Sequence, residues 1–447
     1  MTSLDRFLRS LENVDTVVAE GEVLHWDGLL AHARCPSLAV GHLVQILVNG
    51  GYKLAEVVGF NDRTAQLMPL EDMSGLAPGA RVRTLGRELT AKVGPDLLGR
   101  VLNGLGEPID DRGPLLAEGE YPLQAQAPPA MRRKRITEPL GLGIRAIDGV
   151  LTIGKGQRVG IFAGSGVGKS TVLGMIARNT AADINVIALV GERGREVLEF
   201  IEASLGEEGR ARSVVVVATS NDYALQRVKA PMVAMAIAEY FRDQGKDVLF
   251  MMDSLTRLAM AQRDIGQARG EPPATKGYPP SVFTLLPQFL ERAGTSDKGT
   301  ITGLITVLVE GDEMNEPIAD TARGILDGHI VLSRKMAHRN HYPAIDIMQS
   351  VSRVMPEITS ADHRHSAGKL REALATYSEN EDLINIGAYK PGSNAQIDLS
   401  IKKRDAIVGF LRQGVHEQAT FSESLARLLA MFPPAEWADR PPRPVDG

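Results

Sequence analysis

The fold of this chain is decided by the stretch Ala163-Gly164-Ser165-Gly166-Val167-Gly168-Lys169-Ser170-Thr171. The stretch follows an apolar run, Arg158–Phe162, that predicts a buried strand, and it precedes Val172–Arg178, which predicts a helix. A glycine-rich turn between a strand and a helix, closed by Lys-Ser, is the arrangement of a phosphate-binding P-loop. Its glycines let backbone N–H groups turn toward phosphate oxygens, and the helix start adds unpaired donors and partial positive charge. The segment therefore predicts a nucleoside triphosphate site.

The P-loop pattern also assigns roles to single residues. Gly164–Thr171 are expected to surround the phosphates, with Lys169 reaching the β- and γ-phosphates and Ser170 holding Mg²⁺ through its hydroxyl. The first glycine of the pattern is replaced by Ala163, a small residue that the end of a strand should tolerate. A glycine-rich turn that binds nothing is the alternative. The intact Gly-Lys-Ser sequence between a strand and a helix argues against that alternative.

Length and composition limit the kind of protein that this chain can be. With 447 residues it is too long for one compact core, so two or three domains are expected. A formal net charge of −5 and a pI near 6.1 argue against a general nucleic-acid binder. The single cysteine, Cys35, excludes an intramolecular disulfide and fits a reducing compartment. Because the chain has no signal-peptide core and no apolar run long enough to span a bilayer, we expect a soluble, cytoplasmic protein.

The first 90 residues divide into a helix and a β-rich domain. Residues 1–15 predict an amphipathic helix, which could pack on its own domain or dock a partner. Its apolar residues at helical spacing are Leu4, Phe7, Leu8 and Leu11. Residues 16–90 alternate short β-rich segments with turn residues, which predicts a small β-barrel. The expected strands are Val17–Val23, Leu43–Val48, Leu54–Phe60, Ala65–Met68 and Val82–Thr84.

Residues 91–360 show the pattern of a parallel α/β domain. Turn residues are frequent over Gly94–Asp111, and the basic run Arg132–Arg135 lies in an extended connector that could be an anion patch, although a solvated linker is favoured. From Gly141 to about Pro356, apolar strands alternate with helical segments such as 196–205 and 230–244, which predicts a parallel sheet covered by helices. The expected strands after the P-loop are Ile184–Val190, Ser213–Ala218, Val248–Met252, Thr300–Val309 and His329–Leu332.

The rest of the chain is expected to be helical and to end in a tail. Residues 361–432 predict a C-terminal helical domain, and residues 433–447 contain five prolines and predict a disordered tail. The clearest helical patterns are Lys369–Tyr377, Lys402–Leu411 and Phe421–Phe432.

Three further residues follow from the chemistry that a bound triphosphate needs. The strand Val248–Met252 ends in Asp253, whose carboxylate would complete the Mg²⁺ shell beside Ser170. Glu192 follows a neighbouring strand, where a carboxylate can orient and polarise the attacking water. A loop glutamate paired with a nearby arginine is the alternative for Glu192. Phosphoryl transfer often uses an arginine, but spacing alone cannot select one, and for Arg353 it favours a surface salt bridge.

Seven motifs together carry a resemblance to a known family. They are Ala163–Thr171, Gly191–Val197, Glu239–Gly245, Asp253–Arg257, Gly270–Thr275, Ile325–His329 and His341–Asp346. With them the chain resembles the type III secretion ATPases, relatives of the catalytic subunit of rotary ATP synthases. The resemblance runs from about Gly94 into the helical C-terminal region and is weaker in the β-rich N-terminus. The P-loop sequence is more similar to the flagellar export branch than to the virulence-injectisome branch.

The resemblance implies a fold, an assembly and an activity. The fold is α/β: a RecA-like P-loop ATPase core with an N-terminal β-barrel domain and a C-terminal helical domain, six copies of which form a homohexameric ring. The implied activity is Mg²⁺-dependent ATP hydrolysis that energises flagellar type III protein export. Hydrolysis would displace a central stalk and release export substrates from their chaperones.

The resemblance also implies roles for four residues. It assigns Glu192 as the carboxylate that activates the attacking water and Arg353 as an arginine finger that reaches the nucleotide of the neighbouring subunit. Tyr342 matches the aromatic residue that packs on adenine, and Phe421 aligns loosely with a second adenine-facing aromatic residue. An ordinary core position is the alternative for each of these two rings.

The implied partners are other proteins of an export apparatus. A stator protein would dock on the helix of residues 1–15, and a central stalk protein would contact the loop Arg269–Pro280, for which a stiff loop without a partner is the alternative. An export gate and chaperone–substrate complexes are further expected partners. The ATPase would lie at the cytoplasmic face of the apparatus, peripheral to the inner membrane, and would bind no nucleic acid.

Three rival functions share the same core. An injectisome ATPase has the same chemistry in a different machine. A noncatalytic rotary ATP synthase subunit usually lacks the catalytic glutamate, whereas Glu192 is present here. A Rho-type RNA helicase is disfavoured by the acidic pI and by the absence of an evident basic and aromatic surface in residues 16–89.

Overall fold

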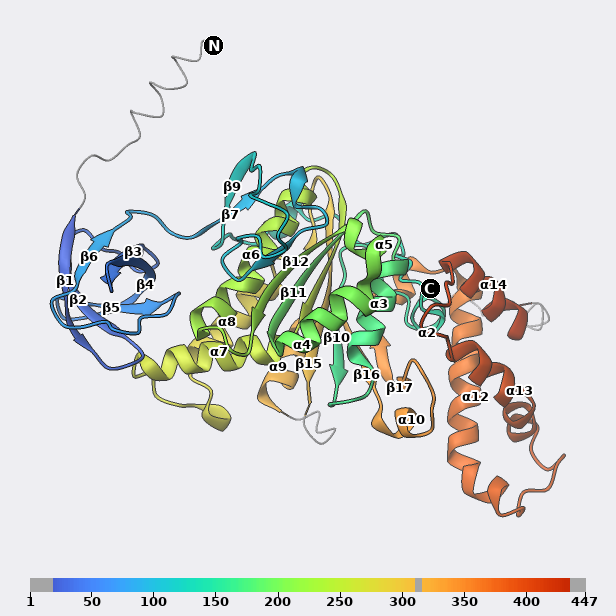
Figure 1. The fold of residues 1–447 in the computed structure, drawn as a ribbon. Coiled ribbons are helices and arrows are strands. Elements are labelled where there is room, and N and C mark those ends of the chain that lie inside the picture. The colour runs from blue at the N-terminus through green and yellow to red at the C-terminus, as the bar shows by residue number, and fades with distance from the viewer. Residues whose placement is uncertain (1–18, 310–315, 435–447) are drawn as a thin grey trace, which may run out of the picture.

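The computed structural model describes residues 19–309 and 316–434, which form three parts in chain order (Figure 1). A β-barrel comes first, a large sheet with helices on both faces lies in the middle, and a group of helices ends the chain. This arrangement confirms the predicted fold class. The amphipathic helix expected over residues 1–15 and nearly all of the tail expected over 433–447 lie outside the described residues. The division into domains stays a prediction, with bounds at 16–90, 91–360 and 361–432.

Six antiparallel strands close the barrel in the order β1-β2-β5-β4-β3-β6. Side chains alternate between the two faces of a strand, so that β3 buries Val44, Ile46 and Val48 inside the barrel. The sequence did not predict β2, because its residues, Ala-His-Ala-Arg, include no β-branched or large aromatic side chain. The strands are β1 Glu20–Trp26, β2 Ala31–Arg34, β3 Leu43–Val48, β4 Gly51–Asn61, β5 Thr64–Pro69 and β6 Arg81–Thr84.

A nine-stranded sheet forms the centre of the protein, in the order β17-β16-β10-β15-β13-β11-β12-β8, with β14 paired to β15. All of its strands run parallel except β14 and β17. The carboxyl ends of the parallel strands therefore meet along one edge, where ligands bind in sheets of this kind. The strands are β8 Val101–Asn103, β10 Arg158–Ala163, β11 Ile184–Glu192, β12 Ser213–Thr219, β13 Asp247–Asp253, β14 Gly294–Thr295, β15 Thr300–Leu308, β16 Gly328–Leu332 and β17 Ile345–Ser352.

Both faces of the sheet are buried, which explains why its strands are continuous apolar runs. On β12, Val214 and Val216 belong to the core on one face, whereas Val215 and Val217 belong to the core on the other. The helices that surround the sheet are α2 Arg145–Val150, α3 Lys169–Asn179, α4 Gly194–Glu199, the π-helix η3 Phe200–Leu205, α5 Gly206–Ala211, α6 Ala224–Asp243, α7 Leu255–Ala268, α8 Pro280–Leu290, α9 Pro317–Ile325, α10 Arg334–His338 and α11 Met355–Ile358.

The C-terminal helices pack on the same core as the P-loop helix. Leu370, Phe410 and Leu428 are buried in one cluster with residues of α2, α3 and β10. The fit is tight at Gly149 in α2, where an added side-chain carbon would lie only 2.7 Å from Cζ of Phe410. These helices, at the orange-to-red end of Figure 1, are α12 Ala361–Asn385, α13 Ala395–Leu411 and α14 Phe421–Met431.

The structure differs from the sequence predictions in several further places. Strand β8 lies inside Gly94–Asp111, where turn residues dominate, and β17 was not predicted. Helix α6 begins six residues before the predicted start at Ala230 and continues through Pro231, although a proline removes a helix hydrogen bond. Within the basic run, Arg133 donates to the carbonyl oxygens of Ala293 and Glu291, so the linker is docked there rather than fully solvated. Between barrel and sheet, β7 Thr90–Val93 and β9 Gly119–Pro122 form a separate antiparallel pair.

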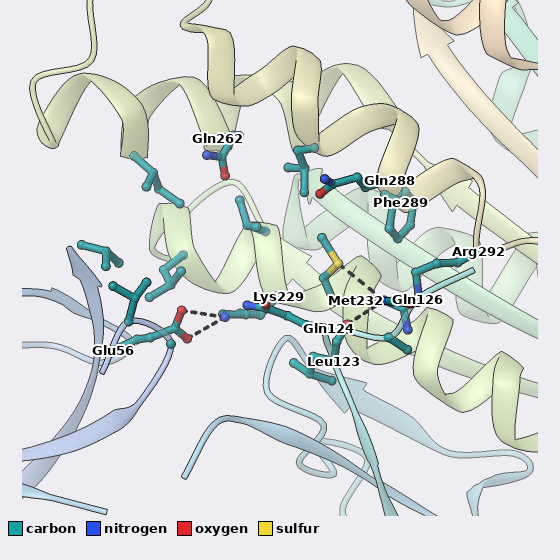
Figure 2. Close-up of a pocket in the computed structure, with 18 of the residues that line it drawn as sticks. Glu56, Leu123, Gln124, Gln126, Lys229, Met232, Gln262, Gln288, Phe289 and Arg292 are labelled. Carbon is teal, nitrogen blue, oxygen red and sulfur yellow. Dashed lines mark hydrogen bonds and ion pairs between the residues drawn. The ribbon is translucent and has the colours of Figure 1, made fainter. Parts of the chain in front are cut away.

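A cavity of about 850 Å³ lies between the barrel and the central domain. Figure 2 shows the buried ion pair of Glu56 and Lys229 on one wall and Arg292 and Phe289 on the other. Burial raises the pKa of Glu56, and the Lys229 ammonium, 2.6 Å away, opposes that effect. The residues that line the cavity belong to the barrel, the linker after β9 and helices α6 to α8, and thus to a different place from the P-loop.

The ion pair of Arg292 and Glu239 fastens α8 to α6, and breaking it should destabilise the fold. Both side chains are almost fully buried, and two hydrogen bonds of 2.7 and 2.9 Å join them. Glu239→Ala leaves the guanidinium without its counterion, so we expect a loss of about 3–5 kcal/mol in the free energy of unfolding, measured with urea. The matched control is Asp320→Ala in the exposed pair with Arg323, which should cost less than about 1 kcal/mol. Equal losses in both variants would contradict the assignment.

Candidate active site

The P-loop lies between β10 and α3, at the edge where the carboxyl ends of the strands meet. Its backbone uses the left-handed region at Gly166, with φ of 76°, and at Gly168, with φ of 89°. Only glycine adopts this region without a steric penalty, so these two residues allow the loop to curl around a phosphate. Val167 is buried below the loop, whereas Ser165 and Gly166 are exposed above it. The geometry is that of the predicted phosphate cradle.

Three charged side chains from three different segments meet beside the P-loop. Nζ of Lys169, in the first turn of α3, lies 2.5 Å from Oδ1 of Asp253 and 3.4 Å from Oε1 of Glu192. Asp253 ends β13 and Glu192 ends β11, and these strands are direct neighbours in the sheet. The topology of the sheet therefore brings together three residues that are up to 84 positions apart.

The electrostatics of this cluster are set by burial and by mutual contact. Burial raises the pKa of Glu192 to about 7, with a further contribution from the charge of Asp253 and an opposing one from Lys169. Burial alone would lower the pKa of Lys169, but the two carboxylates outweigh it and raise that pKa. Lys169 therefore stays positively charged, while Glu192 changes its charge close to neutral pH.

Asp253 and Ser170 offer the oxygen ligands that a hard divalent cation prefers. Oδ1 of Asp253 also accepts a hydrogen bond of 2.8 Å from the hydroxyl of Thr306 on β15. Ser170 is exposed one residue after Lys169, at the start of α3. Within residues 19–309 and 316–434 no three His, Cys, Asp or Glu side chains cluster as a metal site, so a cation here would need phosphate and water oxygens as well. That donor set fits the Mg²⁺ of a nucleotide complex.

Of the two predicted base-contacting rings, one lies at the P-loop. A side-chain carbon at Gly168 would be 3.6 Å from Cε1 of Tyr342, and the Tyr342 side chain is exposed. Phe421, by contrast, lies against Gly141 and 6.0 Å from the ring of His363. This is the opposite end of α3, about 16 Å along an eleven-residue helix. The structure therefore does not bring Phe421 beside Tyr342.

Arg353 lies on the opposite edge of the sheet from the P-loop of its own chain. Its backbone N–H donates to the carbonyl of Asp327, whose N–H donates to the carbonyl of Arg158 at the start of β10. The P-loop follows the other end of that six-residue strand, about 20 Å away. The Arg353 side chain is exposed, with one hydrogen bond of 3.3 Å to the carbonyl of Arg323. It cannot reach a nucleotide held by its own P-loop.

Sequence reasoning missed two residues next to the charged cluster. Thr306 orients Asp253, and β15 contains two other threonines, so its sequence did not single this one out. The side chain of Arg257 packs across Gly191, where an added carbon would lie 3.0 Å from its Cβ, and its charge opposes the rise in the pKa of Glu192. Arg257 belongs to the motif Asp253–Arg257, but neither its spacing nor the resemblance assigned it a role.

Known proteins match every part of this architecture. Residues 143–352 match the nucleotide-binding domain of the ATP synthase alpha/beta family, and residues 33–86 match that family's beta-barrel domain. Residues 359–430 match the T3SS EscN ATPase C-terminal domain. A flagellum-specific ATP synthase of Bacillus subtilis is 54% identical over 426 residues, which are 94% of this chain and 97% of the relative. The chain belongs to the type III secretion ATPases of the ATP synthase alpha/beta family.

ATPases of type III secretion systems outside the flagellar branch match this secretion ATPase as well. A type 3 secretion system ATPase of Xanthomonas euvesicatoria is 51% identical over 92% of this chain and 93% of the relative. The assembled ATPase EscN of enteropathogenic E. coli is 45% identical, with a TM-score of 0.88 over 92% of this chain and 99% of that one. EscN in complex with its central stalk EscO matches with a TM-score of 0.87.

Family membership makes this protein an ATP-hydrolysing enzyme with a nucleotide as its substrate. The described helices of the secretion ATPase include none that is long and apolar enough to cross a membrane.

Proposed function

We propose that this secretion ATPase hydrolyses Mg²⁺-ATP in a homohexameric ring and energises flagellar type III protein export. The observation that carries the proposal is the cluster of Lys169, Glu192 and Asp253 beside a P-loop with the backbone of a phosphate cradle. Flagellum-specific relatives from Bacillus subtilis and Pseudomonas aeruginosa, at 54% and 49% identity, support the flagellar branch. An injectisome ATPase is the second candidate, because the Xanthomonas relative is 51% identical.

Each charged residue has a distinct task in this mechanism. The P-loop N–H groups and Lys169 bind and neutralise the phosphates, with the lysine already held at the site by two carboxylates. Glu192, which titrates near pH 7, accepts the proton of the attacking water in its deprotonated form. Ser170 and Asp253 would hold Mg²⁺, which supplies charge neutralisation at the phosphates when it is bound. Tyr342 offers its exposed ring to the adenine.

The place of Arg353 supports a ring assembly. Since this arginine lies about 20 Å from its own P-loop, on the far edge of the sheet, it can serve only a nucleotide of another subunit. Each subunit would then present a P-loop to one neighbour and an arginine finger to the other. Hydrolysis in one subunit would depend on the position of the next, which couples the sites around the ring.

Arg353→Ala should leave nucleotide binding intact and remove the rate that assembly adds. An arginine finger in trans contributes about 10³-fold or more to turnover, so we expect a loss of that order at protein concentrations where the wild type is assembled. The measurement is ATPase activity per chain against protein concentration, which should rise steeply for the wild type and stay flat for the variant.

Arg63→Ala, which removes an exposed arginine in the turn between β4 and β5, is the matched control and should behave as the wild type does. Assembled Arg353→Ala rings that hydrolyse ATP at the wild-type rate would refute the finger. A wild type whose specific activity does not change with concentration would refute the shared site.

The proposed stalk partner fits an exposed loop of the chain. The loop Arg269–Pro280 joins α7 to α8, and its residues 272–276 are exposed (Figure 1). Because the relative EscN forms a complex with a central stalk, we assign this loop to a stalk protein. A stator protein on residues 1–15, an export gate and chaperone–substrate complexes complete the proposed set, at the cytoplasmic face of the inner membrane.

Rescue of swimming in a bacterium without its own flagellar ATPase would favour the flagellar branch, and rescue of effector secretion alone would favour the injectisome.

A further inference from the structure

The loop of residues 412–420, between α13 and α14, is clamped onto the central domain close to the nucleotide site. From α2, Arg145 donates a hydrogen bond of 2.9 Å to the carbonyl of Phe410 and forms an ion pair with Glu417. From α3, the P-loop helix, Arg178 donates 2.7 Å to the carbonyl of Val415. This loop of the C-terminal domain is thus tied to α2 and α3, the helices that precede and follow the P-loop strand β10.

Gln413 is the centre of this clamp. It is 4% exposed, and every polar atom of its carboxamide has a partner. The oxygen accepts a hydrogen bond of 2.9 Å from the backbone N–H of Arg145, and the nitrogen donates 2.8 Å to the carbonyl of Gly143 and 2.9 Å to that of Glu417. Gly143 in turn packs on the end of the P-loop helix, where an added carbon would lie 2.3 Å from Cβ of Asn179. A side chain that both donates and accepts is required here.

The same residue holds the backbone of Tyr342. The N–H of Gln413 donates a hydrogen bond of 3.0 Å to the carbonyl of Tyr342. A second, longer link joins the guanidinium of Arg412 to the carbonyl of Arg339, 3.4 Å away. The segment that carries the base-contacting ring is therefore fastened to the C-terminal domain, while the ring itself stays exposed beside Gly168.

We propose that Gln413 is a positioning residue for the purine base: it fixes the segment of Tyr342 relative to the P-loop and so ties affinity for the base to the placement of the C-terminal helices. The inference rests on the proposed nucleotide site. It differs from a purely structural role because only the part of binding that depends on the base should change, whereas phosphate binding by the P-loop should not.

The test compares a ligand that has a base with one that has none. Gln413→Met fills a similar volume without the three side-chain hydrogen bonds. We expect it to raise the KM for ATP by about tenfold, the effect of losing roughly one well-made hydrogen bond, with kcat within about twofold of the wild type. Inorganic tripolyphosphate, a competitive inhibitor that can contact only the phosphate site, should keep its inhibition constant within about twofold. Gln413→Ala is the second variant, and thermal unfolding of each protein shows that it is folded.

A double-mutant cycle separates positioning from general loosening. If Gln413 acts through Tyr342, the combination Gln413→Met with Tyr342→Ala should raise the KM no further than Tyr342→Ala alone. Gln418→Met, the same substitution at an exposed glutamine of this loop, is the matched control, and its KM should stay within about twofold of the wild type.

Additive effects in the cycle, a parallel loss of tripolyphosphate binding, or an unchanged KM in folded Gln413 variants would overturn the inference. If the wild type binds tripolyphosphate but shows no preference for ATP over it, the role of Tyr342 in the proposed function fails instead.

Discussion

Replacing Lys169 with alanine is expected to abolish turnover, with a loss of at least about 100-fold, because one residue supplies the charge that neutralises the β- and γ-phosphates. The structure adds a second reason. Lys169 is the cation that both Asp253 and Glu192 contact, so its removal leaves two buried carboxylates facing each other and raises the pKa of Glu192 further. The variant therefore loses affinity for the triphosphate and also protonates its base at neutral pH.

The measurement for Lys169→Ala combines steady-state ATPase assays with binding of a fluorescent ATP analogue. Lys402→Ala, in which an exposed lysine of α13 is removed, is the matched control and should retain wild-type binding and turnover. Full hydrolysis by the Lys169 variant would refute the assignment of the P-loop as the catalytic nucleotide site.

Glu192→Gln should separate binding from chemistry. Glutamine has nearly the same shape but cannot accept a proton from water, so we expect ATP affinity within a few-fold of the wild type and a loss of about 10²–10⁴-fold in turnover. Binding of the ATP analogue and phosphate release measure the two quantities. The control is Glu199→Gln, an exposed glutamate of α4, which should not affect either of them.

The pH dependence gives the Glu192 variant a second readout. Burial raises the pKa of Glu192 to about 7, and only the deprotonated carboxylate acts as a base. The kcat/KM of the wild type should therefore fall as pH decreases below 7, and the residual activity of Glu192→Gln should lack this dependence. A wild-type profile that is flat from pH 6 to pH 8, or a variant that keeps the same profile, would assign the proton transfer to another group.

The parts of the site that depend on local sequence were predictable. The P-loop is one continuous segment: its glycines and lysine lie within the nine residues Ala163–Thr171, and the strand and helix that flank it are adjacent in sequence. Asp253 and Glu192 were predictable as well, because each follows an apolar strand, and parallel strands end at a common edge. Strand β2 was not, because its residues have weak strand preferences, and the part of α6 before Pro231 was not, because a proline usually marks the start of a helix or interrupts it.

The parts of the site that depend on contacts across the chain could not be predicted in this way. Gln413 lies 268 residues from Arg145, and its role appears only when the C-terminal helices fold back onto α2. For Arg353, spacing favoured a surface salt bridge, because the nucleotide that it is proposed to contact belongs to another subunit. Only the resemblance suggested a role as an arginine finger. That resemblance also proposed Phe421, which the fold places at the wrong end of α3 for this purpose.

The two ends of the molecule differ in how freely they can evolve. The barrel fills its interior with its own residues, such as Val44, Ile46 and Leu67, so substitutions on its solvent-facing side leave that interior intact. The C-terminal helices share their buried residues with α2 and α3, and at Gly149 an added carbon would lie 2.7 Å from the ring of Phe410. Substitutions in the C-terminal helices must therefore be matched by compensating substitutions in α2 and α3, which flank the P-loop strand. Exchanges of segments between export ATPases should therefore be tolerated more readily in the barrel than in the C-terminal helices.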